Sequence, residues 1–148
     1  MAEGVFGRVI EEEGVAHLFE VDSAGLGDWH VGQAPDTRAQ SAARRRGIDI
    51  SGQSARQVTR ADYAHFDLLL AMDGSNFAEL TQLAPKNARH KIHRLLDYAP
   101  HTGTQDVPDP FFGGREGFDH AFDLIEHAAR GLLADLLDDR AGSAKKEA

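Results

Sequence analysis

Hydrophobic and polar positions repeat with two different periods along this chain, one typical of helices and one typical of strands. Apolar residues near the start recur every three or four positions, which predicts an amphipathic helix over 2–13 that Gly14 ends. Over 19–23 they recur at every second position, as in a short strand with one buried face. The stretch from Ala24 to Pro35 is rich in glycine, which predicts a loop.

The same alternation continues to the end of the chain. The remaining predicted elements are a helix over 36–46, a short helical turn capped by Thr59 and Asp62, a strand over 68–72, a helix from Ser75 that Pro85 ends, a strand over 91–96, a loop over 97–117 and a helix over 118–138. The run 68–72 is apolar throughout, as expected for a strand buried on both faces. This order predicts a single three-layer α/β/α domain with a parallel sheet over 1–138, and we expect the polar tail 139–148 to be disordered.

The net charge and the hydropathy of the chain count against two classes of partner, nucleic acid and membranes. The formal net charge is −8, which counts against nucleic acid. No stretch approaches the ~20 apolar residues of a membrane span, so we expect no membrane insertion. The start carries three successive glutamates where a signal peptide has an apolar core, so we expect a cytoplasmic protein. The one basic run, Arg44 to Arg46, is either a solvated helix face or a patch for an acidic partner.

Two segments carry candidate chemistry. Asp109 stands between Pro108 and Pro110, and the stiff loop that these prolines predict suits a general acid. The alternative is an ordinary turn in which the aspartate bonds its own backbone. Trp29, the only tryptophan, lies in the glycine-rich loop. It either forms the wall of a cleft for an aromatic ligand or packs down over the core.

The absence of one residue type limits the chemistry further. The sequence contains no cysteine, which excludes disulfides, thiolate metal ligands and a cysteine nucleophile within these residues. His90 and His93 are three positions apart, and on a strand they would point to opposite faces. With no other ligand cluster in the sequence, we expect no metal centre and no cofactor.

Five segments form a recognisable series: MAEGVF, VDSAGLGDWHVG, AARRRGIDISGQSARQ, FDLLLAMDGSN and VPDPFFGG. In order and spacing they resemble the low-molecular-weight protein tyrosine phosphatases, and the resemblance covers residues 1 to about 138. It implies that a cysteine thiolate attacks the phosphorus of a phosphotyrosine protein or peptide, while an arginine clamps the phosphate. It also implies an aspartate that protonates the leaving phenolate.

The resemblance assigns roles to residues of this chain. It places Asp109 at the position of the general acid and Trp29 on the cleft wall beside the phenyl ring of the substrate. Phe111 and Phe112 stand where the family commonly has two tyrosines. Phe111 can still stack on a substrate ring, whereas neither phenylalanine can be phosphorylated.

This chain departs from the family pattern in one respect. The family's nucleophile loop, a cysteine followed by five residues and an arginine, lies directly before the segment that matches MAEGVF, and these residues do not include it. We therefore expect the chain as given to be inactive. Either the loop is encoded upstream of Met1 and the complete protein hydrolyses phosphotyrosine, or the chain is a truncated, non-catalytic binder of phosphorylated or acidic partners.

The family's first strand, which lies in the middle of the sheet, is absent with that loop. Its two neighbours would face a gap of about 10 Å with unpaired backbone groups, so we expect the fold to change. One outcome is that a second copy of the chain fills the gap, so a homodimer is one possible assembly.

A second family, the arsenate reductases, shares this architecture. Its members relay electrons through cysteines, so the lack of cysteine counts equally against them.

Overall fold

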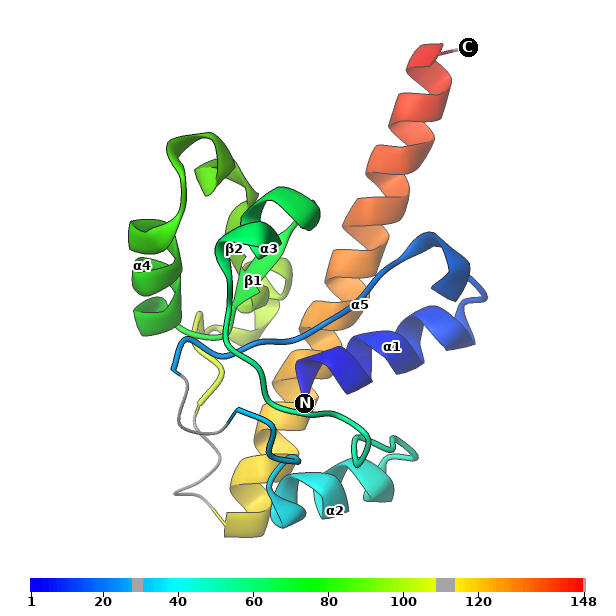
Figure 1. Cartoon of the computed structure of the whole chain (residues 1–148). Coiled ribbons are helices and arrows are strands. Elements are labelled where there is room, and N and C mark those ends of the chain that lie inside the picture. The colour runs from blue at the N-terminus through cyan, green and yellow to red at the C-terminus, as the bar shows by residue number, and fades with distance from the viewer. Residues whose placement is uncertain (28–30, 109–113, 148) are drawn as a thin grey trace.

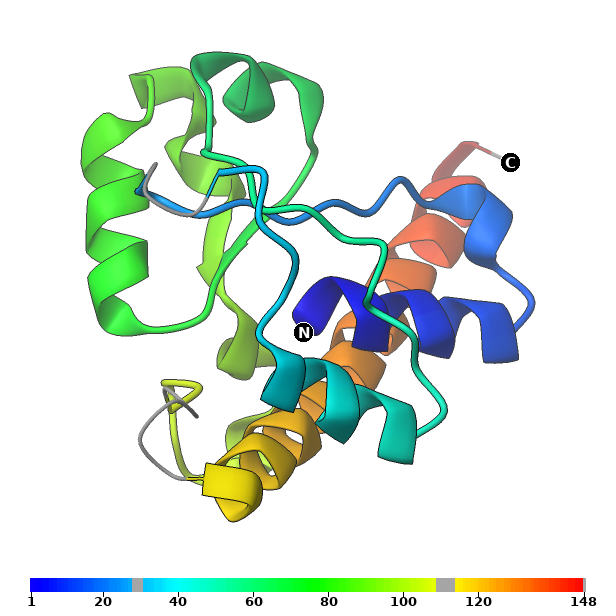
Figure 2. The ribbon, with the colours of Figure 1, turned by 60° about the horizontal axis from the view of Figure 1, so that its bottom comes forward.

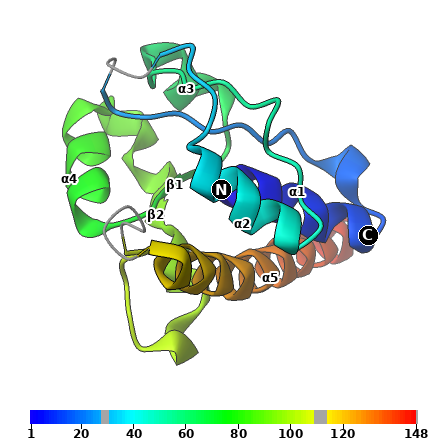
Figure 3. The ribbon, with the colours of Figure 1, turned by 90° about the horizontal axis from the view of Figure 1, so that it is seen from below.

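A computed structural model describes residues 1–27, 31–108 and 114–147, with side chains in the last helix as far as Asp138. One group of helices comprises α1 (Ala2–Glu12), α2 (Thr37–Arg45) and α5 (Gly114–Glu147). The other side holds α3 (Arg60–His65) and α4 (Gly74–Leu83). Two strands, β1 (Leu69–Ala71) and β2 (Ile92–Arg94), lie between α4 and the first group, as the view from below shows (Figures 1 and 3).

The helices begin and end where local sequence signals place them. The Asp36 carboxylate accepts a hydrogen bond from the Arg38 amide at 2.8 Å at the start of α2, and Gly47 beyond its end has a φ of +75°. At α3, the Thr59 amide donates to the Asp62 carboxylate at 2.8 Å. The predicted helices over 2–13 and 36–46, and the capped turn, are therefore confirmed within a residue or two.

The two strands pair in parallel, with Leu69 opposite Ile92 and Ala71 opposite Arg94. Both strands are shorter than predicted. The chain after β2 turns directly into a 3-10 helix at Leu95–Tyr98, which buries Leu95 and Leu96. Three further short 3-10 helices cover Ala16–Leu18, Lys86–Lys91 and Pro100–Thr102.

The strand predicted over 19–23 is wrong. Phe19 is extended, with φ −128° and ψ 142°, but no ladder joins this segment to β1 in the described part of the chain. Phe19 and Val21 are half-buried while Glu20 and Asp22 are exposed, so the alternating burial persists without strand pairing. The segment crosses the molecule from the end of α1 towards the sheet (Figure 2). A strand exists only where a neighbour supplies hydrogen bonds, and β1 pairs here with β2.

The core has two parts, one on each side of the sheet. The larger part joins α1, α2 and α5 and fully buries Ile50, Leu96 and Phe122. The smaller part packs α3 and α4 against the strands around Tyr63, whose hydroxyl donates to the Leu80 carbonyl at 2.9 Å. Each fully buried large apolar side chain contributes about 1.5–3 kcal/mol, so the larger cluster is the main source of stability.

The last helix is longer than predicted. It begins at Gly114, four residues before the predicted start, and continues to Glu147, so it includes residues 139–147 of the predicted tail. The residues after 138 are mostly alanine, lysine, arginine and glutamate, which favour helix, and the single Gly142 costs only about 1 kcal/mol. Within the described residues, no helix combines the length and apolar character needed to cross a bilayer.

Two arginines of the basic run at the end of α2 contact α5. Arg45 pairs with Asp119 at 3.2 Å, and Arg46 pairs with Asp123 at 2.7 Å while its guanidinium lies over the Phe122 ring. These two arginines therefore hold α2 against α5. Neither sequence-based interpretation of the run had assigned them this structural role.

Candidate functional site

The three predicted site residues, Trp29, Asp109 and Phe111, lie outside the described residues. The structure does describe the residues on both sides of the two loops that carry them. It also describes the N-terminus of α1, directly before which the resemblance places the family's nucleophile loop. These neighbouring residues define where the site lies.

The loop that contains Trp29 is held at both ends by one short segment. Four backbone hydrogen bonds of 2.7–2.8 Å form this double attachment: Gly25 N to Arg56 O, Val58 N to Gly25 O, Gly32 N to Ala55 O, and Ala55 N to Gln33 O. Gly25 and Gln57 form an isolated parallel bridge at the same place. The span 26–31 therefore leaves the segment 55–58 and returns to it.

Arg56 reinforces the first of these attachments through its side chain. Its Nε donates to Asp22 at 3.0 Å, and its two Nη atoms donate to the two carboxylate oxygens of Asp62 at 2.9 and 3.1 Å. The guanidinium holds the pKa of Asp62 below its usual range, and the Thr59 amide adds to this effect. Sequence reasoning missed this role, because Asp22 lies 34 positions from Arg56 and only the Thr59–Asp62 cap was recognisable.

The loop that contains Asp109 leaves from the carboxyl end of β1. The Val107 amide donates to the Met72 carbonyl, directly after the strand, at 2.8 Å. In parallel α/β sheets, ligands bind beyond the carboxyl ends of the strands. Met1, Met72 and Val107 all pack against the same large apolar cluster.

The N-terminus of α1 lies in the middle of the molecule (Figures 1 and 2). Its position allows the free amides of the first turn and the helix dipole to attract an anion. Burial lowers the pKa of the Met1 α-amino group, and the nearby Glu3 opposes this shift. The Glu3 carboxylate accepts a hydrogen bond from the Ser23 hydroxyl at 2.7 Å, which links α1 to the segment that leads into the Trp29 loop.

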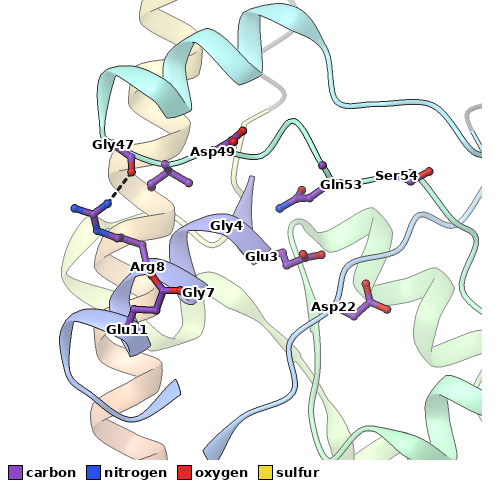
Figure 4. Close-up of a pocket in the computed structure, with 12 residues that line it drawn as sticks. Glu3, Gly4, Gly7, Arg8, Glu11, Asp22, Gly47, Asp49, Gln53 and Ser54 are labelled. Carbon is purple, nitrogen blue, oxygen red and sulfur yellow. Dashed lines mark hydrogen bonds between the residues drawn. The ribbon is translucent and has the colours of Figure 1, made fainter. Parts of the chain in front are cut away.

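A concavity lies beside α1, with Arg8 and several carboxylates in its lining. It measures about 550 Å³ and lies between α1 and the segment 47–54, where the Arg8 guanidinium donates to the Gly47 carbonyl at 2.6 Å (Figure 4). Its lining includes the carboxylates of Glu3, Glu11, Asp22 and Asp49. Four carboxylates repel a phosphate, so this cleft does not suit a phosphate ester. Sequence reasoning did not predict the cleft.

The histidines considered as ligands lie on different elements, His90 in the 3-10 helix before β2 and His93 in β2. Among the residues that the structure describes, no group of histidine and acidic side chains is arranged to hold a metal ion.

Comparison with known proteins decides the family. The model of the family described as low molecular weight phosphotyrosine protein phosphatase matches residues 1–142. The chain belongs to this family. It is 39% identical over 137 residues to the low molecular weight protein-tyrosine-phosphatase YfkJ of Bacillus subtilis, covering 92% of this chain and 86% of that protein. It is 37% identical over 147 residues to the low molecular weight protein-tyrosine-phosphatase of Streptomyces coelicolor, covering 97% of this chain and 89% of that protein.

The fold agrees with the family as well. The protein tyrosine phosphatase of Entamoeba histolytica, crystallised with HEPES in its active site, matches with a TM-score of 0.90 and 32% identity, covering 94% of this chain and 88% of that chain. The predicted family and the predicted α/β/α phosphatase fold are thus confirmed. The described elements keep the family arrangement. The effect of a missing central strand stays a prediction. The roles of Asp109, Trp29 and Phe111 stay predictions.

Proposed function

We propose that this chain forms the body of a phosphotyrosine protein phosphatase, and that turnover needs a cysteine nucleophile that its 148 residues do not contain. The family match over residues 1–142 carries the proposal. The anchoring of both predicted site loops, one on the segment 55–58 and one at the end of β1, supports it.

In this proposal the residues of the chain act on the leaving group and on the aromatic ring. A thiolate on the family's Cys-x5-Arg loop attacks phosphorus, and the bond between phosphorus and the phenolic oxygen breaks. Asp109 gives its proton to that oxygen and then takes a proton from the water that hydrolyses the phosphocysteine. Trp29 and Phe111 lie against the ring of the phosphotyrosine. A cytoplasmic location suits this chemistry, because that compartment keeps thiols reduced.

The first experiment tests whether adding the nucleophile loop to the chain gives activity. Residues 1–148 are compared with a fusion that places the family's first strand and Cys-x5-Arg loop before Met1, with an aryl phosphate as substrate. We expect no hydrolysis by residues 1–148 and measurable hydrolysis by the fusion. In the fusion, Asp109→Asn should lower kcat/KM by about 10²–10⁴ for a substrate with a poor leaving group.

Three other results would decide against parts of this proposal. Hydrolysis by residues 1–148 alone, lost in Asp109→Asn, would show that the added loop is unnecessary. A folded fusion without activity would contradict the catalytic function. If residues 1–148 bind a phosphotyrosine peptide without turnover, and Trp29→Ala abolishes binding while the fusion stays inactive, the chain is a non-catalytic binder instead.

A further inference from the structure

Three successive residues before the Asp109 loop are each bound by a different part of the body. The Gln105 side-chain oxygen accepts from Arg94 Nη1 at 2.7 Å. The Asp106 carboxylate accepts from the Gly74 amide at 2.9 Å. The Val107 amide donates to the Met72 carbonyl at 2.8 Å. A surface connection of this kind needs no such set of attachments, so the segment 105–107 is held in a defined place.

The Asp106 bond uses the N-terminus of α4. Gly74 is the first residue of α4, and the amides of a first helical turn have no acceptor within their own helix. The Asp73 carboxylate already accepts from the Asn76 amide at 2.7 Å. Asp106 therefore brings a second carboxylate to the positive end of the α4 dipole, where a negative charge is stabilised.

Arg94 is held close to the same segment. It is the last residue of β2, and its guanidinium lies over the Phe77 ring of α4, 5.3 Å from the ring centre. A Cβ atom at position 74 would lie 3.3 Å from Arg94 Nη2, so the glycine leaves room for this side chain. The cation–π contact fixes the guanidinium that binds Gln105.

We propose that Asp106 and Arg94 are positioning residues that fix the direction in which the chain enters the loop of the general acid. The inference rests on the proposed function, in which Asp109 is that acid. Asp109 follows Asp106 by three residues, and the fixed φ of Pro108 stiffens the path between them. A small displacement of a catalytic group lowers the rate strongly, so these attachments set the efficiency of proton transfer.

The attachment itself is tested on residues 1–148 by amide hydrogen exchange. Asp106→Ala removes the acceptor for the Gly74 amide, and we expect faster exchange at Gly74 and Val107. Asp106→Asn keeps an oxygen acceptor and should give an intermediate rate. Unchanged exchange at Gly74 in Asp106→Ala would overturn the inference at this step.

The positioning role is tested in the completed phosphatase with two substrates. Protonation matters more for phenyl phosphate, which has a poor leaving group, than for 4-nitrophenyl phosphate. Asp106→Ala and Arg94→Ala should each lower kcat/KM for phenyl phosphate about tenfold more than for 4-nitrophenyl phosphate, and Asp106→Asn should recover most of the loss. The matched control is Asp135→Ala, an exposed acid on α5, which should leave the ratio of the two values unchanged.

The remaining outcomes separate this inference from the proposed function. An equal loss for both substrates means that the contacts only stabilise the fold, and it overturns the positioning role. If Asp109→Asn discriminates between the substrates while Asp106→Ala and Arg94→Ala do not, the proposed function stands and this inference fails. If the completed protein has no activity, both fail together.

Discussion

At the scale of single residues, Arg56 connects several separate parts of the described chain. Its side chain binds Asp22 before the Trp29 loop and Asp62 in α3, while its backbone carbonyl accepts from Gly25. Asp62 is largely buried, with 13% of its side chain exposed, so its charge depends on this partner. If one of these side chains is removed, the charges of the remaining ones therefore lose a hydrogen-bond partner.

Replacing Asp62 by asparagine tests this cluster through pH. Its pKa is lower in the folded protein than in the unfolded chain, so its contribution is fully present above the unfolded value, near ~3.9. That contribution is lost as the pH falls through the folded pKa. We expect Asp62→Asn to lower the free energy of unfolding by about 1–2 kcal/mol at pH 7, and the difference from the parent to shrink below about pH 4.

Urea unfolding of both proteins between pH 7 and pH 3 measures this difference. Asp67→Asn, which removes an exposed acid outside the cluster, is the matched control. A difference between Asp62→Asn and the parent that does not change with pH would show that the Arg56–Asp62 pair is not the cause.

At the scale of elements, α5 passes very close to the 3-10 helix Leu95–Tyr98. A Cβ atom at Gly131 would overlap the Tyr98 carbonyl oxygen, whereas a Cβ atom at Gly7 in α1 would meet nothing within 4 Å. We expect Gly131→Ala to lower the unfolding free energy by about 1–3 kcal/mol through overpacking. Gly7→Ala should raise it by about 0.5–1 kcal/mol, because alanine favours helix. Chemical denaturation followed by circular dichroism compares them, and equal stability of both variants would contradict the close packing.

The helices and strands also show which structural features can be predicted from local sequence. The helix starts at Asp36, Thr59 and Asp73 depend on capping contacts within three residues, so local patterns locate them. The segment 19–23 has the alternation of a strand, but pairing depends on a neighbour that no local pattern contains. The extension of α5 to Glu147 was not predicted, because a polar composition alone does not separate a helix from an irregular tail, although its residues favour helix.

At the scale of the whole molecule, the sheet is small for a domain of this size. β1 has one paired edge, and Leu69 and Leu70 are only half-buried although the strand is entirely apolar. A strand added between β1 and the segment 19–24 supplies hydrogen bonds to both and covers these side chains. We expect the completed protein to unfold at a higher urea concentration and with a larger m-value than residues 1–148. Identical midpoints and m-values would show that the added strand does not enter the sheet.

The candidate site was predicted from the resemblance more than from local chemistry. The Asp109 and Trp29 segments are recognisable in sequence, but the contacts that anchor them come from residues about 30 positions away, as with Gly25 and Arg56 or Asp106 and Gly74. Such anchors have no sequence signal of their own. Only the folded chain reveals them.

The double attachment of the span 26–31 also bears on how this protein can change over time. Both ends of the span join the same four residues, 55–58, so the two attachments do not depend on how many residues lie between them. We expect insertions between the attachments to leave the rest of the chain folded. If the proposed function holds, selectivity for different phosphorylated targets can change in this span at little cost in folding.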